Sequence, residues 1–96
     1  MNLQEFQASI NRNTPPEGSS QELIALWQDA KGNWDTAHSI VQKMHTADAM
    51  WVHAYLHREE GDLSNSMYWY HRVHRSMPPI TLEEEWKEIA IALLDT

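Results

Sequence analysis

The chain has 96 residues, no cysteine and a formal net charge of −7, with 7 basic against 14 acidic side chains. This length favours one domain, the missing cysteines exclude disulfides and thiolate metal sites, and the acidic balance argues against a nucleic acid partner. No apolar run approaches the ~20 residues of a membrane span, and the first residues lack a secretion signal. We therefore expect a cytoplasmic protein outside the membrane, distinguished by five tryptophans and six histidines.

The first half of the chain has the pattern of three helices. Apolar residues spaced i, i+3 and i+7 from Leu3 predict a short N-terminal helix, which a proline-rich loop follows. Ser19 with Glu22 three positions later predicts a capping box at the start of the second helix. Gly32 ends that helix, and Asn33 caps the third.

The second half predicts three more helices. The first covers about 47–60 and ends at Gly61, and the next runs to about Ser76, where two prolines stop it. Thr81 with Glu84 predicts a second capping box. The apolar side of the last helix consists of Leu82, Trp86, Ile89 and Leu93. Because no segment alternates between polar and apolar residues as strands do, we expect an all-α protein.

Two segments share one pattern, 29 positions apart. Gly32 and Gly61 are each followed by a polar cap and a large apolar residue, and five positions on stand Ala37 and Ser66. A small residue at that place lets two helices approach closely. Each segment therefore predicts a helical hairpin, and hairpins of this kind stack because neither can bury both faces alone.

Residues 21–45 and 47–78 resemble the tetratricopeptide (TPR) repeat family. The resemblance rests on Gly32, Ala25 and Ala37 in the first unit, and on Ala54, Gly61, Ser66, Tyr70, Val73 and Pro78 in the second. The sequence departs from the family where Gln21 and Gln28 replace aromatic residues and where Met50, His53 and His57 replace the usual large residues. Its period is also shorter than the family's, which is about 34 residues.

The resemblance implies two stacked antiparallel hairpins in a single domain, 1–96. We expect the first hairpin at 19–45, the second at 47–78 and a capping helix at 81–95, with a short helix before them. The implied function is a non-catalytic protein–protein interaction module. Neither a nucleophile motif nor a glycine-rich phosphate loop is present, so we expect no enzymatic activity and no organic cofactor.

A stripe of Trp51, Tyr55 and Arg58 is the first candidate binding site. These residues are spaced i, i+4 and i+7 on the helix that, in TPR-like stacks, lines the concave surface. Such a surface would suit a peptide with an acidic side chain or a terminal carboxylate. The alternative is that the rings pack against a neighbouring helix while Arg58 pairs with Glu59 or Asp62.

Two further surfaces are candidates for contact with another protein. The consecutive aromatics 68–70 cannot all face one core, and Trp69 is the one without an obvious packing role, so we include it in the partner-binding set. Ile91 falls on the polar side of the last helix. This position suggests a homodimer contact through 81–95 as well as a capping role.

Histidines offer an alternative function as a metal- or small-ligand-binding protein. His53 and His57 share a helix face, and His71 lies level with His53 if the hairpin folds at Gly61. Imidazole nitrogens at such positions can ligate a divalent metal. The competing interpretation is that the same histidines are neutral, hydrogen-bonded groups of the interior.

Overall fold

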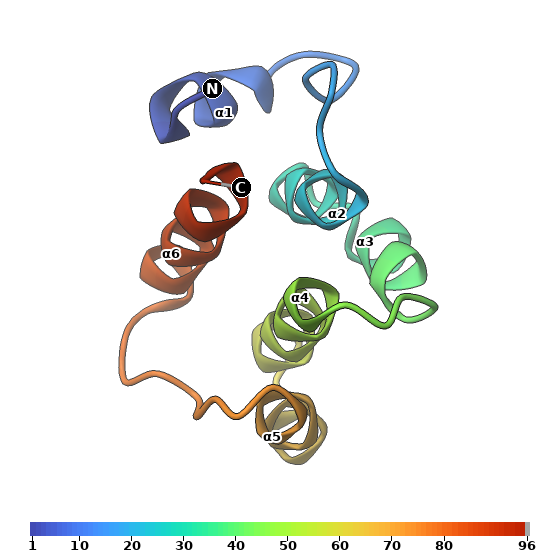
Figure 1. Ribbon diagram of the computed structural model, residues 1–96, viewed down its shortest axis with the longest axis vertical. Coiled ribbons are helices and arrows are strands. Elements are labelled where there is room, and N and C mark those ends of the chain that lie inside the picture. Colours follow the sequence, from blue (N-terminus) through green and yellow to red (C-terminus); the bar gives the residue numbers. More distant parts are fainter. Residues whose placement is uncertain (96) are drawn as a thin grey trace.

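The computed structural model describes residues 1–95 and contains six helices within them (Figure 1). They are α1 (Leu3–Ser9), α2 (Gln21–Ala30), α3 (Trp34–Val41), α4 (Ala47–Glu59), α5 (Leu63–Arg72) and α6 (Leu82–Leu94). No strand occurs in this part of the chain, which confirms the all-α prediction. None of these helices has the length and apolarity needed to cross a membrane.

The predicted cap of α6 is confirmed, whereas Asn33 stands at the start of α3 without a side-chain capping hydrogen bond and the cap of α2 differs from the prediction. Thr81 and Glu84 form the predicted capping box at the start of α6. The prediction that Ser19 caps α2 was wrong, because its hydroxyl donates to the carbonyl of Pro16 at 2.7 Å. Ser20 takes its place and accepts from the backbone N–H of Leu23.

The two interhelical glycines have the left-handed backbone that the hairpin turns require. The φ angle is 87° at Gly32 and 88° at Gly61, a region that glycine enters without a Cβ clash. The end predicted for α5, near Ser76, was wrong. The helix stops at Arg72 because His74 turns left-handed with a φ angle of 58°, and a hydrogen bond from the N–H of Arg75 to the carbonyl of Tyr70 closes the last turn.

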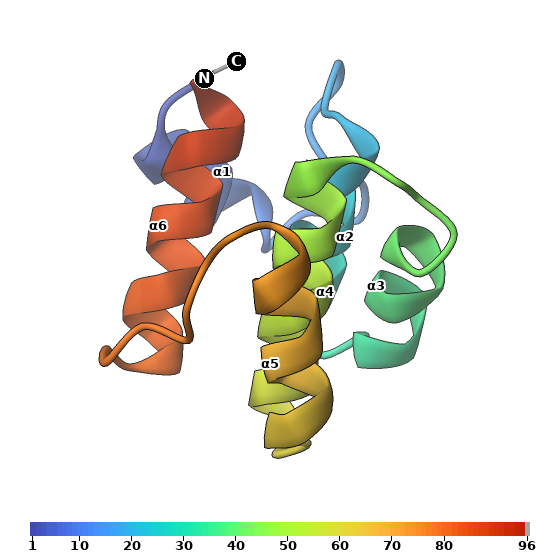
Figure 2. The same ribbon diagram turned by 60° about the horizontal axis from the view of Figure 1, so that its bottom comes forward.

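Helix α4 lies in the middle of the molecule. It contacts α2, α3, α5 and α6, as both views of the ribbon show (Figures 1 and 2). Within the sequence-adjacent pairs, α2 packs on α3 and α4 packs on α5. The segment 73–81 then leads to α6, which packs against α2 and α4, while α1 rests on α6. Every residue of α4 from Trp51 to His57 is thus buried.

Tryptophans join the helices at defined points. Phe6 of α1 stacks on Trp86 of α6 with ring centroids 5.6 Å apart. Four of the five indole N–H groups donate to a group outside their own helix. These bonds are Trp27 to the Ser9 carbonyl, Trp34 to the Leu56 carbonyl, Trp51 to the Glu85 carboxylate and Trp86 to the Leu26 carbonyl. Each bond satisfies a donor that would otherwise be costly to bury.

Candidate functional site

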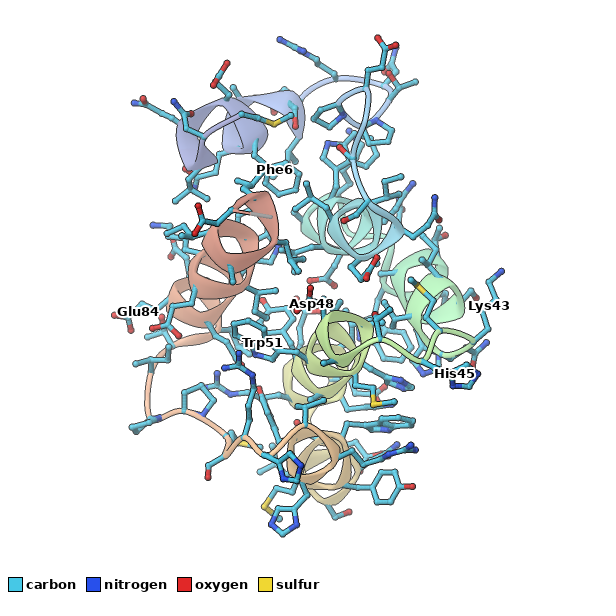
Figure 3. The ribbon with its side chains drawn as sticks, viewed as in Figure 1. Phe6, Lys43, His45, Asp48, Trp51 and Glu84 are labelled. Atoms are coloured by element: carbon cyan, nitrogen blue, oxygen red, sulfur yellow. The ribbon has the colours of Figure 1, made fainter. Side chains whose placement is uncertain are left out.

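The stripe of Trp51, Tyr55 and Arg58 lies inside the molecule. Trp51 is 6% exposed and Tyr55 is 3% exposed, and the Arg58 side chain is largely buried. Trp51 points from α4 toward α6, whereas Glu84 of α6 points away from the body of the molecule (Figure 3). The rings therefore pack against a neighbouring helix, as the alternative interpretation had it.

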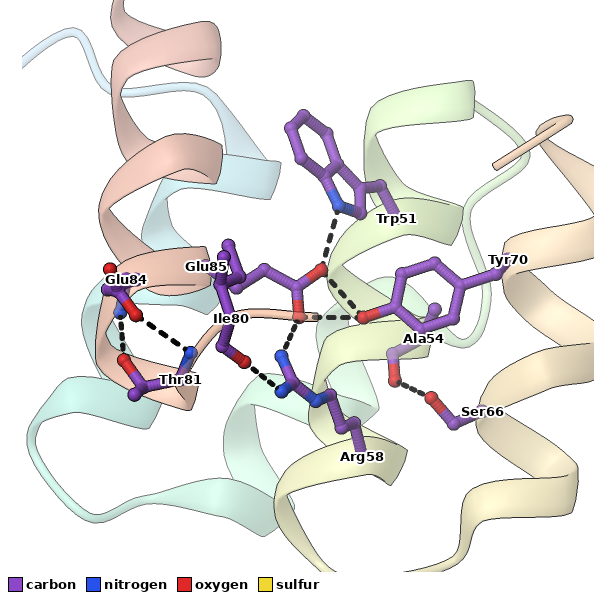
Figure 4. A network of polar contacts seen from close by, with 9 residues as sticks. All are labelled: Trp51, Ala54, Arg58, Ser66, Tyr70, Ile80, Thr81, Glu84 and Glu85. Carbon is purple, nitrogen blue, oxygen red and sulfur yellow. Dashed lines mark hydrogen bonds and ion pairs between the residues drawn. The ribbon is translucent and has the colours of Figure 1, made fainter. Parts of the chain in front are cut away.

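A buried carboxylate on α6 is the partner of this stripe. Glu85 is fully buried, and Arg58 donates to its Oε1 at 2.8 Å (Figure 4). The Tyr70 hydroxyl donates to both carboxylate oxygens at 2.7 and 2.6 Å, and Trp51 Nε1 donates to Oε2 at 3.3 Å. Arg58 also donates to the carbonyl of Ile80, just before α6. One carboxylate thereby joins α4, α5 and α6.

The environment of Glu85 alters its tyrosine partner. Burial raises the pKa of the Tyr70 hydroxyl, and the hydrogen bond to the carboxylate raises it further. Tyr70 is therefore a donor throughout the neutral range. Arg58 pairs with Glu85 and not with Glu59 or Asp62, the two acids that the sequence suggested. An acid 27 positions away in sequence cannot be recognised as a partner without knowing how α6 docks.

Three histidines meet between α3 and α4. His53 and His57 of α4 come together as predicted, and His38 of α3 joins them. His38 Nε2 and His53 Nε2 are 3.1 Å apart, and one ligand nitrogen from each of the three rings lies within 4.8 Å of the others. His53 and His57 are buried, whereas His38 is only half-buried. The cluster therefore has a side that faces solvent.

Aromatic rings and polar side chains hold the three imidazoles in place. Trp34 stacks on His38 with centroids 4.9 Å apart, and Trp69 stacks on His53 at 4.1 Å. The stack gives Trp69 the packing role that the sequence did not reveal. His57 Nδ1 lies 2.6 Å from a carboxylate oxygen of Glu60, and its Nε2 lies 3.3 Å from the side-chain amide of Asn65.

Two of these imidazoles are easier to keep neutral than a free histidine. Burial lowers the pKa of His53 to about 4, with a further contribution from the neighbouring His38 and His57. Burial and the adjacent His57 also lower the pKa of His38. A neutral imidazole has a lone pair available for a proton or a metal ion.

His71 lies apart from the cluster, on the outer side of α5. It is exposed and lines a groove of about 420 Å³ between α5 and the segment 73–77. The hairpin register that places His53 and His71 at the same level does not bring their side chains together. The histidine that contacts His53 from another helix is His38 of α3.

The groove is lined by apolar, aromatic and basic side chains. Met67 and Tyr68 are 53% and 55% exposed on α5 and line it with His71 and Arg75. The Arg75 guanidinium lies over the Trp51 ring, 3.6 Å from its centroid. Exposed apolar side chains that gather beside a groove are typical of a contact surface.

A carboxyl pair lies beside a second hollow, lined in part by Tyr55. Asp29 of α2 and Glu59 of α4 both line this hollow, and each influences the pKa of the other. Burial raises the pKa of Asp29, and burial together with Asp29 raises the pKa of Glu59 to about 9. The pair is 30 positions apart in sequence, so its formation depends on how α2 packs against α4.

Comparison with known proteins finds no matching family model, no curated protein and no solved structure. Sequence reasoning found His53 and His57 but missed His38, Glu85 and Asp29. A periodic pattern shows which residues share one helix face, and it does not show which other helix packs there.

Proposed function

We propose that the protein is a non-catalytic, TPR-like interaction module that binds an acidic amphipathic helix of another protein. The binding surface in this proposal is the outer groove of α5, not the stripe on α4. The observation that carries it is the groove lined by Met67, Tyr68, His71 and Arg75. The side chains of Met67 and Tyr68 are more than half exposed there.

The charge distribution supports an acidic partner. The chain carries a net charge of −7, yet the C-terminal end of α5 and the residues after it carry His71, Arg72, His74 and Arg75. Arg75 lines the groove, and its guanidinium lies over the Trp51 ring. Arg72, close to it in sequence, lies over the rings of Tyr68 and Trp69. Carboxylates of a partner would pair there with arginines already oriented.

The helix arrangement supports a helical partner. If α2–α3 and α4–α5 are TPR-like hairpins, α5 is the outer helix of the last one, and the next unit of a stack would pack on its free face. In this structure α6 instead packs on α2 and α4. A helix of another protein would thus take the place that a third hairpin has in a longer array.

A titration with a designed peptide tests the proposal. The probe is an amphipathic peptide of about 15 residues made of leucine and glutamate, long enough to form a helix on binding. We expect NMR shift changes confined to α5 and 73–77 and lost in Met67→Glu. The matched control is Ile91→Glu, which changes an equally exposed side chain on α6 and keeps binding.

A second peptide with lysine in place of glutamate separates charge from simple apolar contact. The proposal fails if this basic peptide binds as tightly as the acidic one, or if Met67→Glu binds like the wild type.

A homodimer contact through 81–95 stays a prediction. Ile91 is 53% exposed there, and Ile91→Glu would abolish such a dimer in sedimentation.

A further inference from the structure

We propose that His38, His53 and His57 bind one divalent first-row transition metal ion, with zinc as the ion to be tested first. This site is separate from the α5 groove, and the proposal does not depend on the peptide-binding function. It differs from the set expected from sequence, because His38 replaces His71. One nitrogen from each of the three residues lies within 4.8 Å of the others, between α3 and α4.

The spacing of the nitrogens suits a shared ion. Two imidazole nitrogens bound to one tetrahedral zinc, each at about 2.0–2.1 Å, lie about 3.3 Å from each other. His38 Nε2 and His53 Nε2 are 3.1 Å apart, which is close to that separation. Because the two nitrogens face each other in a hydrogen bond, the rings must turn until both lone pairs point to the ion. The ion would replace the hydrogen bond between the two nitrogens, and the ring that donates in it would take its other tautomer.

The third histidine has a partner that prepares it for a metal. Histidine ligands usually donate their second ring N–H to a carboxylate, a backbone carbonyl or a water, which fixes the tautomer and makes the ligating nitrogen more basic. His57 Nδ1 lies 2.6 Å from Glu60 and can donate to it, leaving the Nε2 lone pair for the ion. The amide of Asn65, 3.3 Å from that Nε2, would have to turn away.

The donor set selects the class of ion. Three neutral imidazoles suit zinc, copper, nickel or cobalt, whereas magnesium and calcium require oxygen ligands. Three protein ligands also leave one tetrahedral position for water. The half-buried His38 lies on the side from which an ion and that water would enter.

A second group of potential metal ligands shares His57 with the three-histidine site. His57, Glu60 and Asp62 also have ligand atoms within 4.8 Å of one another, but both acids are exposed. Asp62 already caps α5 by accepting from the N–H of Asn65. Only the three-histidine site contains His38, so a variant at this position distinguishes the two.

Calorimetry on the chelator-treated chain, without a histidine tag, is the first test. We expect zinc to bind at one ion per chain, and magnesium to give no heat. His38→Ala should weaken zinc binding by at least about 10–100-fold, since losing a partner of a ligand already costs that much. The matched controls are His71→Ala and His45→Ala, which change exposed histidines outside the cluster.

Tryptophan fluorescence supplies a second readout. Trp34 and Trp69 pack directly on two of the ligand rings, so bound Cu²⁺ should quench part of the emission in the wild type and not in His38→Ala. If His38→Ala does not fold, imidazole NMR signals of the wild type answer the question instead. Zinc should then shift the signals of His38, His53 and His57 and leave the other three histidines unchanged.

Three results would overturn the proposal. They are the absence of both heat and thermal stabilisation with zinc, zinc affinity in folded His38→Ala equal to that of the wild type, and an equal loss of affinity in His71→Ala. Loss of binding in a Glu60→Gln variant together with full binding in His38→Ala would assign the ion to the second group.

Discussion

Replacing Glu85 by glutamine should destabilise the protein far more than its small change in shape suggests. Glu85 is fully buried and accepts from Arg58, Tyr70 and Trp51 at distances between 2.6 and 3.3 Å. Glutamine presents one oxygen and one NH₂ group. With its oxygen toward Arg58, its NH₂ group must face the Trp51 N–H, and two donors then oppose each other.

The expected decrease in the free energy of unfolding follows from breaking the buried ion pair between Arg58 and Glu85. Removing one charge of such a pair costs about 3–5 kcal/mol, and the oxygen that glutamine retains places this variant near the lower end, about 3 kcal/mol. For a domain of this size the midpoint of thermal unfolding should fall by roughly 12–24 °C, at about 4–8 °C per kcal/mol. Circular dichroism during urea and thermal unfolding measures both quantities.

Glu88→Gln is the matched control on the same helix. Glu88 is exposed, so its replacement should change the free energy of unfolding by no more than about 0.5 kcal/mol. The reasoning is refuted if Glu85→Gln costs less than about 1 kcal/mol, because a neutral hydrogen bond alone would account for that.

Two further predictions concern pH and a turn. The pKa of His53 is lowered to about 4 in the folded chain, against 6.5 for an exposed histidine. As the pH falls, His53 is therefore protonated in the unfolded state before it is protonated in the folded state. The free energy of unfolding should fall by about 3 kcal/mol between pH 6.5 and 4 relative to His53→Gln, and parallel pH profiles would contradict this. Gly61→Ala should cost about 1–2 kcal/mol in urea unfolding because the φ angle is 88°, and an unchanged midpoint would contradict that reason.

Local sequence signals predicted the helices well because their causes are local. The Thr81–Glu84 capping box and the turns at Gly32 and Gly61 involve residues at most a few positions apart. The end of α5 was the main error. A left-handed histidine has no sequence signature as clear as that of glycine, so His74 closes the helix earlier than the prolines would.

Only two of the three histidines in the candidate site could be predicted from the sequence. His53 and His57 are four positions apart, and a helical period places them on one face. Their third partner, His38, depends on how α3 docks against α4. Helical spacing likewise places Trp51 and Arg58 on one face of α4. It could not predict which helix covers that face. The helix that does so, α6, begins 24 positions after Arg58.

The indole hydrogen bonds give the tryptophan excess a meaning beyond hydrophobicity. Burial alone has no direction, whereas an N–H that must meet one carbonyl or carboxylate on a neighbouring element fixes the rotation of a helix about its own axis. Trp27, Trp34, Trp51 and Trp86 each impose such a condition on a different contact. A collapsed chain with the same helices in slightly rotated positions would leave several of these donors unpaired at once. The four bonds therefore favour a single packing over its near alternatives, and the four indole proton resonances would report separately on each junction as the protein unfolds.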